Sequence, residues 1–152
     1  MGLSLLPLVN RLAADQTVTG SIVPVAITGF TVPIAANQRI AWKIYGGMTV
    51  PATGGWRFTI TVPAGGGAFN WNYQISEAVT PTVYENFIFA NAAVTDASAV
   101  ADDYRILMFG SIENGATAGN VVWNFAQNNA QATNLVLKEG LILEVLRFSV
   151  DT

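Results

Sequence analysis

Alternation of apolar and polar residues with a period of two is the feature that most constrains the fold of this chain. In Trp56–Val62 every second side chain is large and apolar, and the residues between them are Arg or Thr. Residues 68–76 repeat the pattern with aromatic or aliphatic side chains alternating with Asn, Gln and Ser. Because successive side chains of a strand point to opposite faces, each run predicts a half-buried strand. The Gly-rich loop between the two runs predicts that they form an antiparallel hairpin.

Further segments carry strand signals, and Gly, Pro and Asn turns separate them. Tyr104–Ile112 is apolar on both faces, which predicts a strand in the centre of a sheet. Val18–Ile34 predicts two short strands with prolines at their edges, where a missing N–H does least harm. The remaining strand signals lie in Arg39–Tyr45, Gly119–Phe125, Asn134–Leu137 and Leu141–Phe148.

Helical periodicity is confined to the first turns of the chain and to Ser98–Asp103. About eight or nine short strands separated by turns predict an all-β fold, a jelly-roll-like antiparallel β-sandwich. A β-barrel is the second choice. We expect one domain over residues 17–152 and an extended N-terminal arm over residues 1–16.

The predicted arm contains several large aliphatic side chains without a helical or strand period. Each of them gains about 1.5–3 kcal/mol on full burial, so the arm is expected to lie against protein. It either folds back on its own sandwich, as a first strand or short helix, or it binds a neighbouring subunit or another protein. No Lys or Arg precedes the apolar run and Pro7 interrupts it, which argues against a signal peptide. The candidate partner-binding residues are Leu3, Leu5, Leu6, Leu8, Val9 and Leu12.

The chain has few charged residues, 7 Lys and Arg and 10 Asp and Glu among 152. Charged residues make up 11% of the sequence, whereas a soluble domain has about 25%. We therefore expect much of its surface to be covered by other protein. A net charge of −3 without any cluster of Lys and Arg argues against binding to nucleic acid or to a membrane surface.

Catalytic and metal-binding residues are scarce. The sequence has no His and no Cys, which removes the commonest general base, the commonest metal ligand and the best nucleophile. Asp102 and Asp103 are adjacent, so on a strand they point to opposite sides and cannot act together as a glycosidase pair. We expect no catalytic residues, no cofactor and no metal site, and we expect that the chain is not an enzyme.

Aromatic residues suggest one alternative function. Trp side chains near Asn residues could bind a glycan by stacking and by amide hydrogen bonds, as in the receptor-binding head of a phage fibre. Each Trp, however, alternates in phase with aliphatic residues, as core residues do. A place in the core or in a subunit interface is therefore the favoured interpretation. The aromatic residues concerned are Trp42, Trp56, Trp71, Trp123, Tyr73 and Tyr84.

Two stretches resemble trimeric β-sandwich proteins on the capsids of tailed bacteriophages. Met108–Val121, followed by Trp123–Asn128, resembles a hairpin of such proteins, and so does the Gly-Trp-Arg-Phe run at Gly55–Phe58. The resemblance covers about residues 39–148. It implies a head decoration, or cement, protein that is made in the host cytoplasm and binds the outer surface of the virion capsid. The implied partners are the major capsid protein and further copies of the chain in a homotrimer, with the arm reaching over neighbours.

Overall fold

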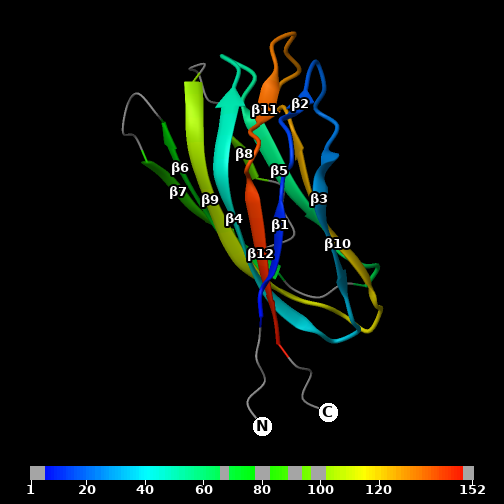
Figure 1. The fold of residues 1–152 in the computed structure, drawn as a ribbon. Coiled ribbons are helices and arrows are strands. Elements are labelled where there is room, and N and C mark those ends of the chain that lie inside the picture. The colour runs from blue at the N-terminus through cyan, green and yellow to red at the C-terminus, as the bar shows by residue number, and fades with distance from the viewer. Residues whose placement is uncertain (1–5, 66–68, 78–82, 89–93, 97–101, 149–152) are drawn as a thin grey trace.

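The computed structural model describes residues 6–65, 69–77, 83–88, 94–96 and 102–148. These residues form twelve strands, and two antiparallel sheets pack against each other as a β-sandwich (Figure 1). The predicted all-β sandwich is therefore confirmed, with more strands than the sequence pattern indicated. No helix within the described ranges is long and apolar enough to cross a membrane.

The larger sheet has eight strands, and six of them follow the order β1-β12-β4-β9-β6-β7. The short strands β2 and β11 pair with each other, and β11 also pairs with β4. As predicted, the segment that is apolar on both faces forms an interior strand, β9, between β4 and β6. The strands are β1 (Leu8–Arg11), β2 (Gln16–Val18), β4 (Arg39–Val50), β6 (Phe69–Glu77), β7 (Val83–Ile88), β9 (Asp102–Glu113), β11 (Leu135–Leu137) and β12 (Ile142–Arg147).

The smaller sheet has four strands in the order β3-β10-β5-β8. Its edge strand β3 is a single ten-residue strand, where the sequence predicted two short strands between residues 18 and 34. Pro33 lies within β3, and an edge strand tolerates it because one side of its backbone needs no partner. The strands are β3 (Val25–Ile34), β5 (Trp56–Thr61), β8 (Val94–Asp96) and β10 (Gly119–Ala126).

Two predicted hairpins are wrong. The strands β5 and β6 belong to different sheets, because β5 pairs with β10 and β8 while β6 pairs with β7 and β9. The run 108–128, which resembles a hairpin of phage proteins, likewise contains β9 of one sheet and β10 of the other. Two consecutive strands with one buried face each give the same sequence pattern whether their loop turns back within a sheet or crosses to the facing sheet.

The turn at 138–140 also has a different role from a hairpin. The strands β11 and β12 on either side of it both pair with β4, one after the other along the same edge. The predicted helical stretch at Ser98–Asp103 falls mostly outside the described residues, and its last two residues begin β9.

Tryptophans from both sheets fill the centre of the core. Gly110 on β9 lies between Trp42 and Trp71 on the neighbouring strands, and the two indole rings meet with centroids 6.0 Å apart. A Cβ at Gly110 would lie 2.2 Å from the carbonyl oxygen of Asn70 and 2.7 Å from Cβ of Trp71. From the facing sheet, Trp123 packs edge-on against Trp42 at 5.7 Å. The glycine thus makes room for the contact between Trp42 and Trp71, and Trp42 also contacts the facing sheet through Trp123.

Side-chain amides close one seam of the sandwich. The Gln16 side chain donates to the carbonyl oxygen of Ala26 and accepts from the N–H of Thr28, both at 2.8 Å. Asn10 donates to the carbonyl oxygen of Gly29 at 2.8 Å. Because Gln16 presents a donor and an acceptor side by side, its amide takes the place of a neighbouring strand along the edge of β3.

Candidate functional site

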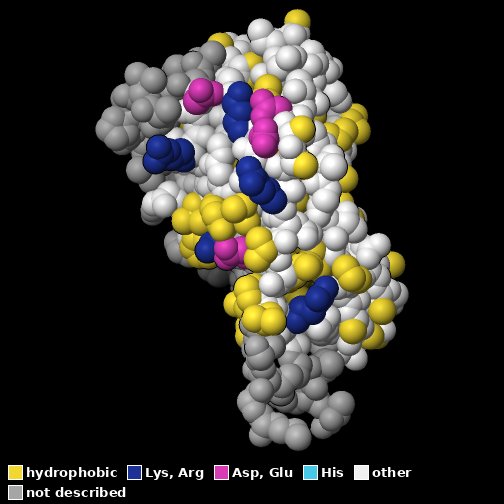
Figure 2. Space-filling view, viewed as in Figure 1, with side chains coloured by type: hydrophobic (Ala, Val, Ile, Leu, Met, Phe, Trp, Pro, Cys, Tyr) yellow, Lys and Arg dark blue, Asp and Glu magenta, His cyan; other side chains and the backbone are white. Residues whose placement is uncertain are grey.

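The candidate site is the outer face of the larger sheet, formed by the side chains of β1, β12, β4 and β9 that point away from the core. On β12 and β4 the inward hydrophobic residues are buried, and the alternate residues face outward. Hydrophobic side chains gather in the middle and lower parts of this view, whereas most charged side chains lie above them (Figure 2). We call this surface the outer face.

Several large apolar side chains are exposed on the outer face or at its end. Phe109 is 43% exposed, Leu146 39% and Val9 54%. Phe148, just past β12, is 40% exposed, and the Arg39 guanidinium lies 6.0 Å above the centre of its ring. Single exposed apolar residues are normal, but several on neighbouring strands of one sheet are typical of an interaction surface.

A polar cluster lies among these apolar side chains. The Tyr45 hydroxyl donates to Oε1 of Glu144 at 2.6 Å, and Nζ of Lys43 lies 3.1 Å from Oε2 of the same carboxylate. The Lys43 ammonium also lies 4.7 Å above the centre of the Tyr45 ring. Lys43 and Tyr45 come from β4 and Glu144 from β12, which pairs with β4 in register. The antiparallel pairing of these two strands therefore builds the cluster.

The electrostatics of this cluster favour a structural role. The hydrogen bond from Tyr45, followed by that from Lys43, lowers the pKa of Glu144 below its ordinary value. The same hydrogen bond to Glu144 is the main cause that raises the pKa of Tyr45. A general acid or base works best with a pKa near the operating pH, and both shifts lead away from neutrality. The carboxylate and the phenol suit fixed hydrogen bonding better than proton transfer.

The outer face also has a hollow of about 180 Å³ between β4 and β12. The residues that line it are Ala41, Trp42, Lys43, Glu144 and Leu146. A small side chain at 41 opposite Leu146 leaves this space, because the two residues are cross-strand neighbours. The hollow is open to solvent.

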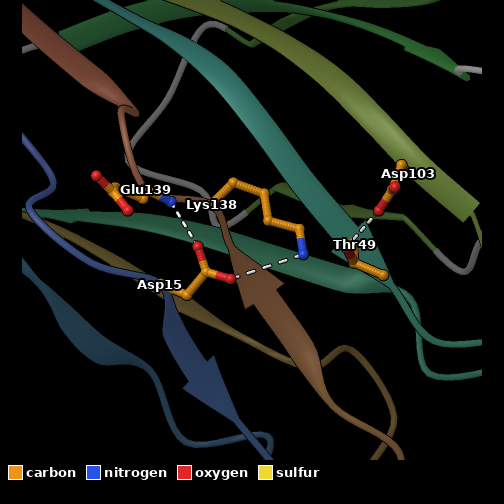
Figure 3. Close-up of polar contacts among 5 residues, drawn as sticks. All are labelled: Asp15, Thr49, Asp103, Lys138 and Glu139. Atoms are coloured by element: carbon orange, nitrogen blue, oxygen red, sulfur yellow. Dashed lines mark hydrogen bonds and ion pairs between the residues drawn. The ribbon is translucent and has the colours of Figure 1, made fainter.

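At one end of the outer face a set of charged side chains ties two turns together (Figure 3). Asp15 accepts a hydrogen bond from the N–H of Glu139 at 2.7 Å and lies 3.7 Å from Nζ of Lys138. The hydroxyl of Thr49 on β4 donates to the carboxylate of Asp103 on β9. The side chains of Asp15 and Lys138 are about half exposed, so their ion pair contributes at most about 1 kcal/mol. The contacts of Asp15 link the β1–β2 turn to the β11–β12 turn, whereas the Thr49–Asp103 hydrogen bond joins β4 to β9.

A second hollow, of about 210 Å³, lies beside this charged end. Asp103, Arg105 and Lys138 line it together with Gly47, Met48 and Tyr104. It therefore presents one carboxylate and two cations. Within the described ranges no three or more His, Cys, Asp or Glu residues come together as they would around a metal ion.

The candidate partner-binding residues are divided between the core and the surface. Leu12 is 2% exposed and lies in the protein's own core, which corrects its assignment to a partner-binding arm. Leu8 packs against that core, and its segment forms β1, paired with β12. Leu6 and Val9 are exposed, and Leu3 and Leu5 lie outside the described residues. Residues 8–11 thus fold back as a first strand with Leu12 buried directly after it, and contact of the exposed residues with a partner stays a prediction.

The aromatic residues that suggested glycan binding lie in the core wherever the structure describes them. The four Trp side chains are at most 3% exposed, and Tyr73 is also buried. The side chain of Tyr84 lies outside the described residues. The described part of this set therefore offers no exposed aromatic platform, as the favoured interpretation predicted.

Sequence reasoning missed the residues that give the outer face its character. Lys43, Glu144, Phe109 and Leu146 occupy outward positions of predicted strands, but their grouping depends on which strands are neighbours and in which register. The sequence pattern does not reveal these strand neighbours or their register, because β4 pairs with strands that lie about 65 and 100 residues further along the chain. A signal was present in the outward positions of Leu146 and Phe109, where an exposed strand face normally carries polar residues.

Comparisons with known proteins give one distant likeness. No family model and no curated protein sequence matches the chain. Among solved structures, a chain from the structure of infectious bursal disease virus, Gx strain, is similar with 13% sequence identity and a TM-score of 0.25. The match covers 93% of this chain and 40% of the viral chain. This likeness is weak, and the function proposed below does not depend on it.

Proposed function

We propose that this chain is a structural protein of a virion, a head decoration or cement protein of a tailed bacteriophage. It binds the outer surface of the capsid, associates with copies of itself and stabilises the shell. The observation that carries the proposal is the outer face, where large apolar side chains are exposed in a chain with 11% charged residues. Such a surface gains free energy when other protein covers it.

Composition and structure favour this function over catalysis. The sequence has no His and no Cys, and the cluster of Lys43, Tyr45 and Glu144 has pKa shifts directed away from neutral pH. Glycan binding is less favoured, because the four Trp side chains that would stack on a sugar are buried. A sandwich with an apolar surface needs neither catalytic residues nor a glycan-binding site to stabilise a shell.

The proposed mechanism is mechanical. Each copy buries apolar surface against other copies and against capsid subunits, so that separating the shell requires many contacts to break together. A stable contact of this kind buries at least about 1,000 Å². We assign contact with the major capsid protein to the exposed start of the N-terminal segment, Leu6, with Leu3 and Leu5 before it.

Co-sedimentation with head shells tests the proposal. Purified protein is mixed with expanded, undecorated shells of the parent phage, and the pelleted fraction is measured against protein concentration. We expect saturable binding that Leu6→Asp weakens, because Leu6 is 83% exposed at the start of the described chain. Val23→Asp, at a 66% exposed position between β2 and β3, is the matched control and is expected to bind normally. Wild-type protein that stays in the supernatant at every concentration would refute the proposal.

A further inference from the structure

We propose that the outer face binds the outer face of a second copy of this chain, about a two-fold axis that runs between β12 and β4. The proposal rests on the self-association included in the proposed function, and it identifies the surface and the symmetry. It departs from the three copies that the resemblance to phage proteins implies. The outward side chains that lie opposite each other on these two strands decide how two copies can pair.

Outward residues of β12 and β4 form complementary pairs across the strands. Glu144 lies opposite Lys43, and the two form an ion pair. Leu146 lies opposite Ala41, with the hollow beside them. Beyond the end of β12, the N–H of Phe148 donates to the carbonyl oxygen of Arg39, whose guanidinium lies over the Phe148 ring. Each pair joins a base to an acid, a large apolar group to a small one, or a cation to an aromatic ring.

A two-fold axis in the interface, parallel to these strands, places β12 of one copy over β4 of the other. Each outward side chain then faces the second copy's equivalent of its own cross-strand neighbour. Glu144 faces Lys43 of the second copy, and Leu146 faces Ala41 of the second copy. In this arrangement the four charges alternate in sign, so each ion gains a second opposite charge. The charge pattern of the outer face is therefore complementary to itself.

The hollow gives this arrangement a steric reason. It is about 180 Å³ and lies beside Ala41, where the rotation brings Leu146 of the second copy. Leu146 is 39% exposed in the single chain and would be covered in the pair. A large apolar side chain that fills a pocket near the centre of an interface is a common source of binding energy.

The flanking strands β1 and β9 extend the complementarity of the outer face with itself. Val9 on β1 lies opposite Glu144, and Phe109 on β9 lies opposite Lys43, so one row across the sheet reads Val9, Glu144, Lys43, Phe109. The same rotation places Val9 of one copy against Phe109 of the other. An apolar group thus meets an apolar group at both ends of the row, while the charges meet at its centre. Sheets that pack face to face with roughly aligned strands are common in β-sandwiches.

Sedimentation velocity and light scattering test the pairing. We expect wild-type protein to have twice the chain mass of 16.1 kDa. Leu146→Asp is expected to have the mass of one chain, since it places a carboxylate at the hollow. Val23→Asp, at a more exposed position outside the larger sheet, is the matched control and should keep the wild-type mass.

Charge reversal tests the symmetry. Lys43→Glu alone sets acid against acid across the axis, and Glu144→Lys alone sets base against base, so each variant should dimerise at least about tenfold more weakly. Mixed together, the two variants should form a pair, because every acid of one then faces a base of the other. Dimer formation in the mixture would also show that both variants are folded.

Three results would overturn this inference: a wild-type mass of one or three chains, a Leu146→Asp variant that keeps the wild-type mass, or a charge-reversed mixture that does not pair. A trimer that binds head shells would leave the proposed function intact and refute only the two-fold contact. A dimer that fails to bind shells would refute the proposed function and leave the two-fold contact intact.

Discussion

At the scale of single residues, small side chains and amides decide how the larger ones pack. Gly110 allows Trp42 and Trp71 to meet across β9, and Ala41 leaves the hollow beside Leu146. Gln127 is fully buried, and its amide donates to the carbonyl oxygen of Thr133 at 2.6 Å while accepting from the N–H of Gln131. Such roles depend on the three-dimensional neighbours of a residue more than on its type.

Gly110→Ala is expected to destabilise the protein by about 1–3 kcal/mol, as overpacking a close-packed core does. The added methyl group would lie 2.2 Å from a backbone oxygen, which cannot move aside without distorting β6. Gly47→Ala is the matched control on β4, because its Cβ would make ordinary contacts of 3.5 Å or more. Urea unfolding of both variants gives the two free energies. Equal stability of the two variants would contradict the tight Trp42–Gly110–Trp71 row.

Glu144 is expected to make stability depend on pH. Its pKa is lower in the folded protein than its ordinary value of 4.5, so folding favours the carboxylate form. The groups that face it are Lys43 and Tyr45 on β4, with Val9 opposite on β1. Its contribution is therefore present above pH 4.5 and is lost as the pH falls through the lowered folded pKa.

Urea unfolding of the wild type and of Glu144→Gln, from neutral to acidic pH, measures this contribution. The wild type should be the more stable at neutral pH, and the difference should narrow below pH 4.5. A difference that stays constant over the whole range would show that the carboxylate contributes nothing through its charge.

At the scale of strands, the seam between β1–β2 and β3 distinguishes this sandwich from two independent sheets. Asn10 and Gln16 hydrogen-bond to the backbone of β3 in place of a strand. A sheet edge closed in this way presents fewer free N–H and C=O groups to other chains. The N-terminal segment is thus part of the sandwich from β1 onward.

Gln16→Ala is expected to lower stability by about 1 kcal/mol, since it removes two hydrogen bonds at a partly exposed edge. The control is Asn120→Ala on β10, which truncates an exposed amide outside the seam. Thermal unfolding measures the loss of stability in each of the two variants. A Gln16→Ala variant as stable as the control would mean that the seam does not depend on the amide.

The two faces of β1 and the segment after it predict opposite effects of truncation. Leu12→Ala is expected to cost about 2–5 kcal/mol, because Leu12 is 2% exposed in the core. Val9→Ala is expected to change stability by less than about 0.5 kcal/mol, because Val9 is 54% exposed. Denaturant unfolding measures both. A neutral Leu12→Ala would return this segment to the role of a partner-binding arm.

Strand positions could be predicted from the sequence, and strand partners could not. The buried positions of β4, β5 and β10 follow the period of two, since Ile40, Phe58 and Val121 lie where alternation places them. The assignment of β5 and β6 to one hairpin was wrong, because alternation specifies a buried face and not the sheet that provides it. The outer face needed the register of β4 with β12 and β9, which depends on contacts between distant parts of the chain.

At the scale of the whole molecule, the scarcity of charge and the apolar outer face both indicate a surface that other protein covers. The interior is well supplied with aromatic and aliphatic side chains, so the remaining apolar residues at the surface are not needed to fill the core. A chain with 11% charged residues keeps such a surface only at the risk of unspecific association unless other protein covers it. Association with copies of itself and with a larger particle would remove that risk.

The mass of the purified wild-type chain in dilute solution, measured by light scattering, tests this central claim most directly. We predict a mass that is a whole multiple of 16.1 kDa, two or more chains, and stable over a wide range of concentration. A soluble single chain of 16.1 kDa at all concentrations would show that the outer face needs no cover, and it would contradict the account.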